Sequence, residues 1–439
     1  MQRSQTLSTP IWWETAAEPV LPIVADLPAE VDVVVVGAGL TGLSAARTLA
    51  GRGKSVLVLD TGVPGGGASS RNGGMVGGGH RLSLDEMEAR FGTPIGHRLL
   101  REAHIESFAF VREVMAKEGI DCDYVEMGRF RGFWRHAEYE ATARWLTRLQ
   151  ELIPLEAEMV PRARQRQEVA SDLYRGGVVF PRHAGLNPAK WVRGMLRATC
   201  RAGAVVVGHT PVTGVSREKV GWRIDMVHQG ARRHVRAGQV LAATNGYTSA
   251  ALPDLRRRII PVPSFIAVTE PLGTERVGKL FPSGRMIVES RDRHCYYRPL
   301  PCGTRIMFGG RAAMFNVAER FASAELHRLL KQVFPDIGPV AFSHSWRGRT
   351  GFSFNYLPNV GQIHGIWHAA GYSGSGNAMA PWLGHKVALQ MLGDPDGETA
   401  FSHTELPTRW WKPGGAWFLP CADLTFRLRD VINNLRRDA

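Results

Sequence analysis

Three glycines and one aspartate near the start of the chain have the spacing of a dinucleotide-binding turn. The motif GAGLTG is followed about twenty residues later by VLVLD, which ends in the aspartate. The glycines permit a tight turn, close approach of backbone N–H groups to a pyrophosphate, and close packing of helix on strand. The acid can accept hydrogen bonds from a ribose diol. The predicted dinucleotide site comprises Gly37, Ala38, Gly39, Leu40, Thr41, Gly42, Asp60 and Thr61, unless this is only a glycine-tolerant turn.

A second glycine-rich segment, GASSRNGGMVGGGH, occupies residues 67–80. Glycine loses more conformational freedom on folding than any other residue, so such a segment indicates that backbone must approach something closely. An acid at position 60 favours an unphosphorylated adenosine ribose, as in FAD or NAD. A long amide-rich segment directly after that acid suits the larger, flat cofactor and favours FAD. The residues predicted to contact it are Ala68, Ser69, Ser70, Arg71, Asn72, Gly73, Gly74 and Met75.

A third glycine-rich turn, GYSGSG, lies late in the chain between the apolar segment GIWHAA and a predicted helix over about 378–392. Pro381 then falls in the first turn of that helix, where proline is tolerated. The positive end of the helix would stabilise an anionic reduced flavin ring. An N-cap that binds no ligand is the alternative. The candidates are Gly371, Tyr372, Ser373, Gly374, Ser375 and Gly376.

Two hydrophobic patterns in the sequence indicate the elements that position these turns. Buried strands at about 31–36 and 54–60, with a helix between them, predict a βαβ unit and a parallel sheet. Residues 261–345 instead alternate and carry aromatic side chains, which is typical of a mixed, largely antiparallel sheet. We therefore expect an α/β fold in which a dinucleotide-binding domain (30–88, 155–258 and 345–395) is interleaved with an α+β substrate domain (89–154 and 259–344). An N-terminal arm (1–29) and a C-terminal tail with a basic amphipathic helix (396–439) complete the predicted chain.

The motifs together resemble the D-amino-acid oxidase and glycine oxidase (DAO) family of FAD-dependent oxidoreductases. The resemblance rests on the dinucleotide unit, GASSRNGG, HAGLNPAKW, VLAATNGYT and WHAAGYSGSGN, and extends over most of residues 30–395. Within the family, SSRNGG resembles the γ-glutamylputrescine oxidoreductase branch. The resemblance implies a Rossmann-like, GR2-type FAD-binding domain with the adenine side at the backbone of Val212 and the pyrophosphate near Ala243, Thr244 and Gly246. For Val212, an ordinary position in the hydrophobic core is as good an interpretation as a contact with the adenine.

The resemblance also implies the chemistry, which is removal of a hydride from a carbon bearing an amine, with hydrolysis of the resulting imine. The substrate is then a small amine or amino acid. Strand period places Tyr297 with Cys295 on one face and Tyr296 with Arg298 on the other, so only one pair can face a substrate. The His183 side chain either forms a structural hydrogen bond or transfers a proton. The pocket candidates are His183, Tyr296, Tyr297, Arg298, Phe308, Trp346, Arg349 and Tyr372, where either arginine could clamp a carboxylate.

Two departures from the family pattern bear on the redox chemistry. Met307 stands where several oxidases of the group carry a lysine over the flavin, so the electron acceptor stays open between O2 and another compound. Asn72 stands where some relatives carry the histidine that attaches FAD, which predicts non-covalent FAD. A third departure, Asn355, replaces the aspartate usual before the late LP motif.

Composition limits the remaining function classes. The net charge of +14 is mostly dispersed arginine, so nucleic-acid binding is not the first reading, although a tRNA-modifying flavoprotein of the same fold is an alternative. An NADPH-dependent flavin monooxygenase is a second alternative, disfavoured because no GD motif in a strand-end context follows the second domain. Five separated cysteines and no metal-like spacing predict no metal site. No apolar span or secretory leader is evident, so we expect a cytoplasmic protein of undetermined oligomeric state.

Overall fold

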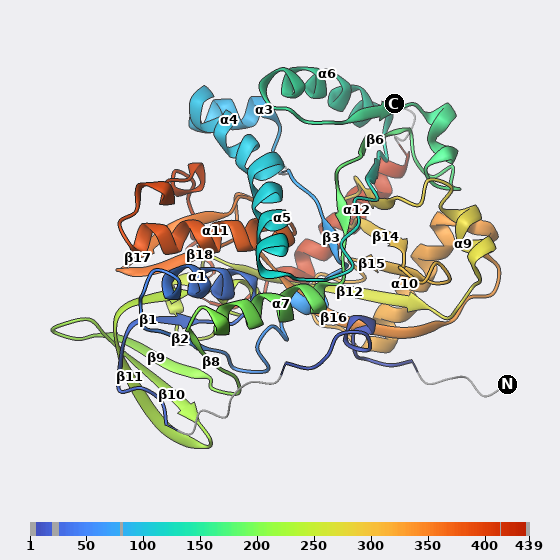
Figure 1. The fold of residues 1–439 in the computed structure, drawn as a ribbon. Helices are drawn as coiled ribbons and strands as arrows, with labels where there is room; N and C mark the ends of the chain where they lie inside the picture. Colours follow the sequence, from blue (N-terminus) through green and yellow to red (C-terminus); the bar gives the residue numbers. More distant parts are fainter. Residues whose placement is uncertain (1–5, 20–25, 80–81, 413, 436–439) are drawn as a thin grey trace.

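Two eight-stranded sheets, each assembled from strands far apart in the chain, organise the protein (Figure 1). The structure is a computed structural model that describes residues 6–19, 26–79, 82–412 and 414–435. Parts of the predicted N-terminal arm (1–5 and 20–25) and the end of the predicted tail (436–439) lie outside the described residues. The mixed α/β fold class expected from the sequence is confirmed.

The first sheet has the order β17-β18-β11-β1-β2-β8, with β10 pairing β11 and β9 pairing β10. Its central strands run parallel, and β1 is buried from Val33 onward because its valines face helices on one side and apolar side chains on the other. The strands are β1 (Glu30–Val36), β2 (Val56–Leu59), β8 (Val205–Val207), β9 (Val212–Arg217), β10 (Trp222–His228), β11 (Ala231–Ala242), β17 (Asn359–Ile363) and β18 (Ile366–Ala370).

Three helices pack together on one face of this sheet: α1 (Leu40–Ala50), α7 (Pro188–Arg201) and α11 (Gly376–Met391). The predicted βαβ unit is therefore present as β1, α1 and β2. Helix α11 begins two residues earlier than predicted, so Pro381 is its sixth residue and not part of its first turn. The proline cannot donate to the carbonyl one turn earlier. Its own carbonyl accepts a hydrogen bond from Ser44 Oγ at 2.6 Å.

The second sheet has the order β16-β12-β15-β14-β13-β4-β6-β5 and is antiparallel except where β13 pairs β4. Helix α10 (Glu319–Val333) packs its apolar side on one face, and α9 (Thr274–Leu280) lies beside it. The strands are β4 (Arg129–Gly132), β5 (Glu158–Val160), β6 (Gly177–Phe180), β12 (Ile260–Thr269), β13 (Met286–Glu289), β14 (Cys295–Pro299), β15 (Ile306–Gly310) and β16 (Phe342–Phe352).

The domain ranges stay a prediction, but the strand pairings add detail to them. Strands β5 and β6 fall in the range 155–258 yet belong to the second sheet, because β6 pairs with β4. Strand β16 begins before position 345 and also belongs to the second sheet. A short ribbon of β3 (Met75–Val76) and β7 (Ala184–Gly185) lies apart from both sheets.

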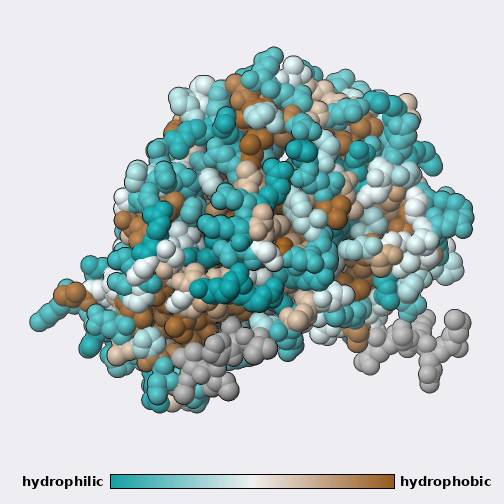
Figure 2. Space-filling model, in the orientation of Figure 1, coloured by the Kyte–Doolittle hydropathy of each residue, from teal (hydrophilic) through white to brown (hydrophobic). Residues whose placement is uncertain are grey.

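The remaining helices lie outside the two sheets. Helices α3 (Leu84–Phe91), α4 (Thr93–Arg101), α5 (Ser107–Glu118) and α6 (His136–Leu152) form the upper part of the view in Figure 1. Short helices are α2 (Ala68–Arg71) and α8 (Pro253–Arg256), and α12 (Leu419–Leu435) is the last element. Figure 2 shows this face as mostly hydrophilic, with smaller hydrophobic areas between. No helix in the described part of the chain is long and apolar enough to cross a membrane.

Candidate functional site

A cavity of about 890 Å³ opens at the carboxyl ends of β1, β2 and β11. We call it the first cavity. Segments from four distant parts of the chain meet on its wall. The predicted residues that line it are Gly37, Gly39, Leu40, Thr41, Asp60, Thr61, Ala68, Ser69, Arg71, Asn72, Val212, Ala243, Thr244, Gly246, Tyr372, Gly374 and Gly376.

The turn after β1 has the backbone shape that its glycines predict. Gly37 has a φ of +105°, and a Cβ there would lie 2.9 Å from the Ala243 carbonyl oxygen. A Cβ on Gly42 would lie 1.9 Å from the Gly37 oxygen, so helix α1 can begin only with glycine at that place. The wall of the cavity at this turn is therefore bare backbone at the N-terminus of α1, as an anion site requires.

Asp60 holds this turn as well as facing the first cavity. Its Oδ2 accepts a hydrogen bond from the Ala38 N–H at 2.8 Å, and its Oδ1 accepts one from the Gly62 N–H at 2.9 Å. Burial raises the pKa of Asp60, while these two N–H groups act in the opposite direction. Ala38 is thus a support behind the wall and not part of the lining.

The glycine-rich segment contains a helical turn that the sequence did not indicate, helix α2. Asn72 follows it and has both ends of its amide hydrogen-bonded inside the protein. Its Nδ2 donates to the carbonyls of Ala68 and Ser69, each at 3.1 Å, and its Oδ1 accepts from the Gly74 N–H at 2.8 Å and from Asn377 Nδ2 at 2.9 Å. The last contact ties the segment to the N-terminus of α11.

A second cavity, of about 460 Å³, lies between this segment and the face of the second sheet turned away from α10. It shares wall residues with the first cavity, among them Arg71, Asn72, Arg349 and Tyr372, so the two are neighbours across one wall. It also contains four predicted cofactor residues absent from the first cavity, Gly73, Met75, Ser373 and Ser375. Five others lie behind the walls: Ala38, Gly42, Ser70, Gly74 and Gly371.

The choice between the two tyrosine faces of β14 is now resolved. Tyr296 lines the second cavity, with its hydroxyl 3.0 Å from Ser264 Oγ. Tyr297 points the other way, into the apolar core under α10, where its hydroxyl lies 2.5 Å from that of Tyr174. Phe308 stacks on Tyr297 with ring centroids 5.3 Å apart. Tyr297 and Phe308 are therefore core residues and not pocket residues.

Arg298 and Trp346 lie beneath the site without lining either cavity. Arg298 is on the same strand face as Tyr296, but its guanidinium donates to the Leu186 carbonyl at 2.8 Å and lies 5.2 Å from the ring centre of Trp12. Burial lowers the pKa of Arg298 to about 10. Trp346 donates its indole N–H to the Arg71 carbonyl at 2.8 Å. Both side chains support the glycine-rich segment and its neighbours.

His183 is also a structural residue in this geometry. Its ring is stacked between Phe180 and Phe108, with centroids 4.8 and 5.3 Å away, and its Nε2 accepts a long hydrogen bond of 3.4 Å from the Gly78 N–H. Burial lowers the pKa of His183 well below the usual range, so the ring is neutral. Of the remaining candidates, Arg349 and Tyr372 do line both cavities, and the Tyr372 hydroxyl lies 2.7 Å from Thr41 Oγ1.

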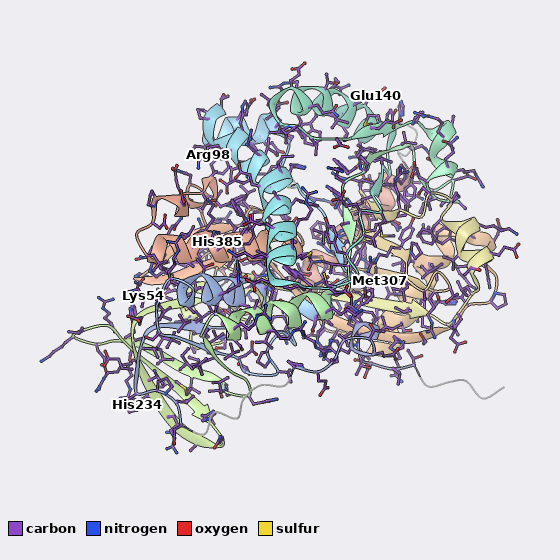
Figure 3. All side chains as sticks on the ribbon, in the orientation of Figure 1. Lys54, Arg98, Glu140, His234, Met307 and His385 are labelled. Carbon is purple, nitrogen blue, oxygen red and sulfur yellow. The ribbon has the colours of Figure 1, made fainter. Side chains whose placement is uncertain are left out.

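Met307 lies beside the glycine-rich segment, and its position over the cofactor stays a prediction. A Cβ placed on Gly73 would be 3.2 Å from Met307 Cε and 2.9 Å from the Tyr296 ring. The methionine is fully buried in β15, and Figure 3 labels it in the interior next to the second sheet. Met307 therefore packs behind the wall of the second cavity, in an apolar cluster with Met75 and Tyr296.

Sequence reasoning missed the basic wall of the second cavity. Arg129 and Arg131 project from β4 into it, while Phe130 between them enters the opposite core. Burial, with a smaller effect of the Arg131 charge, lowers the pKa of Arg129 to about 9. Its Nε is buried and has no hydrogen-bond partner among the described residues. The alternation of arginine and phenylalanine in RFRG could have indicated that both arginines share one face of a strand. An arginine in a strand is usually taken to face solvent.

The same wall holds one acid, which is already paired. Glu289 forms an ion pair with Arg291 at 2.5 Å, and both side chains are buried. Further basic side chains on the wall come from Arg311, His294 and His104. The second cavity therefore has an excess of positive charge facing an apolar, tyrosine-bearing floor.

Comparison with known proteins identifies what the chain is similar to. The family model described as FAD dependent oxidoreductase (DAO) matches residues 32–390. The chain is 29% identical over 401 residues to a probable oxidoreductase OrdL of Haemophilus influenzae, covering 86% of each chain. It is 28% identical over 384 residues to the gamma-glutamylputrescine oxidoreductase of Escherichia coli, covering 85% of this chain and 86% of that one. The crystal structure of glycine oxidase from Geobacillus kaustophilus superposes with a TM-score of 0.70 at 20% identity, covering 87% of this chain and 99% of that one.

Proposed function

Because the chain belongs to the DAO family of FAD-dependent oxidoreductases, we propose that it oxidises an elongated amine that carries an anionic group remote from the reacting nitrogen. The enzyme is an FAD-dependent amine or amino-acid oxidoreductase. The proposal concerns the elongated shape of its substrate. Bound FAD supplies the acceptor for the hydride that leaves the carbon beside the nitrogen. The resulting imine hydrolyses to a carbonyl compound and an amine.

The proposed cofactor position follows from the two neighbouring cavities. The ADP half would occupy the first cavity, where Gly37 and Gly39 present backbone without side chains and Asp60 follows the end of β2. The flavin would lie at the shared wall, against the surface that Asn72 and the N-terminus of α11 form together. The fit is supported by the bare backbone along this path, which a Cβ at several glycines would fill. The Asn72 side chain is an amide and not a nucleophile, which supports FAD held without a covalent bond.

One observation carries the substrate proposal, the separation of the basic wall from the flavin end of the cavity. In the second sheet, Tyr296 pairs with Val288, and Val288 pairs with Arg131. Two steps between neighbouring strands span roughly 10 Å. The carboxylate of a simple α-amino acid lies one bond from its reacting carbon and does not span that distance. A longer amine with a distal carboxylate does.

The charge of the basic wall supports the same substrate class. The Arg129 Nε lacks a protein partner among the described residues, and a buried guanidinium without a carboxylate is costly. An anionic substrate end would offset that cost by pairing with it. The relative named for γ-glutamylputrescine acts on a molecule of this kind, an amine linked through several bonds to a group with a free carboxylate.

The test is to add candidate amines to the holoprotein in the absence of oxygen. Reduction of the flavin is measured as the loss of its absorbance near ~450 nm. We expect γ-glutamylputrescine to bleach the flavin faster than putrescine, and putrescine faster than glycine. Faster bleaching by glycine than by the elongated amine would refute the substrate proposal. Bleaching by NADPH alone would favour the monooxygenase alternative, and steeply salt-dependent tRNA retention would favour the tRNA-modifying one.

A further inference from the structure

Helix α12 carries a continuous apolar stripe on its solvent side. Five large aliphatic side chains recur at intervals of one to four residues and are about half or more exposed, at 59, 56, 60, 48 and 82%. This spacing places them on one face of the helix. Two indoles lie just before the helix and are also exposed, at 93 and 64%. We call this set the C-terminal patch: Trp410, Trp417, Leu424, Leu428, Val431, Ile432 and Leu435.

The opposite face of α12 is docked on the protein. Leu419, Ala422 and Phe426 join the apolar cluster beside Phe352. Asp423 accepts a hydrogen bond from the Met314 N–H at 3.2 Å and forms ion pairs with Arg427 at 2.7 Å and Arg293 at 3.5 Å. The helix is therefore fixed in place, and the C-terminal patch is a second apolar face that its own fold does not use.

The charges of α12 are sorted between these two faces. Asp423 is buried, and Asp430 is turned inward so that burial raises its pKa. Arg429 is exposed on the helix, and Arg409 is exposed beside Trp410. The exposed surface thus combines apolar side chains, indoles and positive charge, and no aspartate or glutamate of the helix faces outward with them.

We propose that the C-terminal patch lies on an anionic lipid bilayer surface. Aliphatic side chains would enter the boundary between headgroups and acyl chains, indoles would lie at headgroup level, and arginines would meet anionic headgroups. The net charge of +14 adds a general attraction to such a surface. A second copy of the chain fits the patch less well, because two such faces would bring arginines together with no outward acid on the helix to pair them.

The placement of α12 relates the lipid surface to the second cavity. Arg427 donates to the Ala312 carbonyl at 3.1 Å, next to Arg311, which lines that cavity. Phe352, on the cavity wall, belongs to the cluster on which α12 packs. A protein held by this patch would therefore keep the wall of its second cavity close to the bilayer. The proposal does not depend on which amine is oxidised.

Two exposed cysteines provide a direct experiment on the holoprotein. Cys421 is on α12, and Cys302 lies in the turn between β14 and β15. An environment-sensitive fluorophore is attached at Cys421 in a Cys200→Ser, Cys302→Ser variant, or at Cys302 in a Cys200→Ser, Cys421→Ser variant. Vesicles of phosphatidylcholine and phosphatidylglycerol in equal parts are then added. We expect a blue shift and brighter emission at position 421 only, and none with phosphatidylcholine alone.

A matched pair of substitutions tests the same surface by vesicle sedimentation. Leu428→Glu should weaken binding to the mixed vesicles at least ten-fold, because it places a charge in the apolar stripe. Val220→Glu makes the same change at a side chain that is 89% exposed and far from α12 in the chain, and it should bind as the parent does. Both proteins should keep their flavin and their activity.

Three results would overturn the proposal. Position 421 and position 302 responding alike to vesicles would remove the role of the patch. Equal binding by the two glutamate variants would do the same. If light scattering shows a dimer that Leu428→Glu converts to a monomer, and no vesicle binding is seen, the patch is an interface between two copies. None of these outcomes bears on the amine that reduces the flavin.

Discussion

The indole nitrogen of Trp12 donates a hydrogen bond of 2.8 Å to the carbonyl oxygen of Asn72. Trp346 makes the corresponding bond to the carbonyl of Arg71, also at 2.8 Å. The two carbonyls are consecutive, and the indoles come from distant segments, Trp12 near the N-terminus and Trp346 in β16. An N-terminal segment and the second sheet therefore hold the glycine-rich segment where the two cavities meet.

Trp12→Phe removes one of these hydrogen bonds and keeps most of the ring. The loss of about 1 kcal/mol from one bond should raise the FAD dissociation constant about five-fold, with the fold retained. Titration of the apoprotein with FAD measures this. Trp417→Phe removes a comparable bond of 3.0 Å to the Trp411 carbonyl on the far tail, and it should leave FAD affinity unchanged. Equal affinities for all three proteins would contradict the support role of Trp12.

Gly42→Ala should prevent FAD binding and destabilise the protein. Its Cβ would lie 1.9 Å from the Gly37 oxygen, and backbone cannot move aside cheaply there. Gly278→Ala is the matched control, because this glycine is also inside a helix but a Cβ would have no atom within 4 Å. The control should gain about 0.5–1 kcal/mol of stability. Urea unfolding and flavin content report both effects, and a normal flavin content in Gly42→Ala would count against the turn as described.

Arg129→Met should weaken substrate binding without lowering the stability of the fold. Loss of the basic wall should raise KM for an anionic elongated amine at least ten-fold with a smaller change in kcat, since the distal end is not at the reacting carbon. The apoprotein should be as stable as the parent or more so, because an unpaired buried charge is removed. Arg232→Met, at an exposed arginine of β11, should alter neither property. A fall in kcat alone would contradict the proposed role.

His368 should make the protein less stable in mild acid. Burial lowers its pKa from 6.5 to about 4, so the folded state binds fewer protons than the unfolded state between those values. Stability is therefore full above pH 6.5 and falls as pH decreases toward 4, by on the order of 1–3 kcal/mol. Urea midpoints at pH 7 and pH 5 test this against His368→Asn. The variant should lose less stability between the two pH values, and an identical loss would exclude His368 as a cause.

The bound FAD should be released by acid. The Asn72 amide is occupied by hydrogen bonds and offers no nucleophile for a covalent bond. Precipitation with trichloroacetic acid should therefore leave a colourless pellet and a yellow supernatant. A yellow pellet after washing would mean that another side chain attaches the cofactor.

The dinucleotide turn could be predicted from the sequence because its constraints are local. Gly37, Gly42 and Asp60 meet within one βαβ unit, where Gly37 has a φ of +105°, Gly42 packs on the Gly37 oxygen and Asp60 holds the Ala38 N–H. The third glycine-rich turn could also be found from its sequence, apart from the start of its helix, although distant residues such as Asn245 and Thr41 hold it in place. Family resemblance added the convergence of the three turns, which spacing alone does not determine.

The second sheet was less predictable because distant segments decide what each strand face meets. The alternation in CYYRP shows two faces, but only the packing of α10 shows which of them is core. Arg129 and Arg131 were missed for the same reason, since the glycine-rich segment that covers them is about fifty residues earlier in the chain. Trp346 lies near the site, as predicted, but it lines neither cavity. It supports the glycine-rich segment through its hydrogen bond to the Arg71 carbonyl.

The order of the strands has a consequence for how such an enzyme can evolve. Within the described residues, the chain passes between the first and second sheets four times. Neither sheet is encoded by one uninterrupted stretch of gene, so recombination cannot exchange one for a homologous module. Substitutions on strands such as β4 and β14 can alter the second cavity without changing the residues of the nucleotide-holding turns.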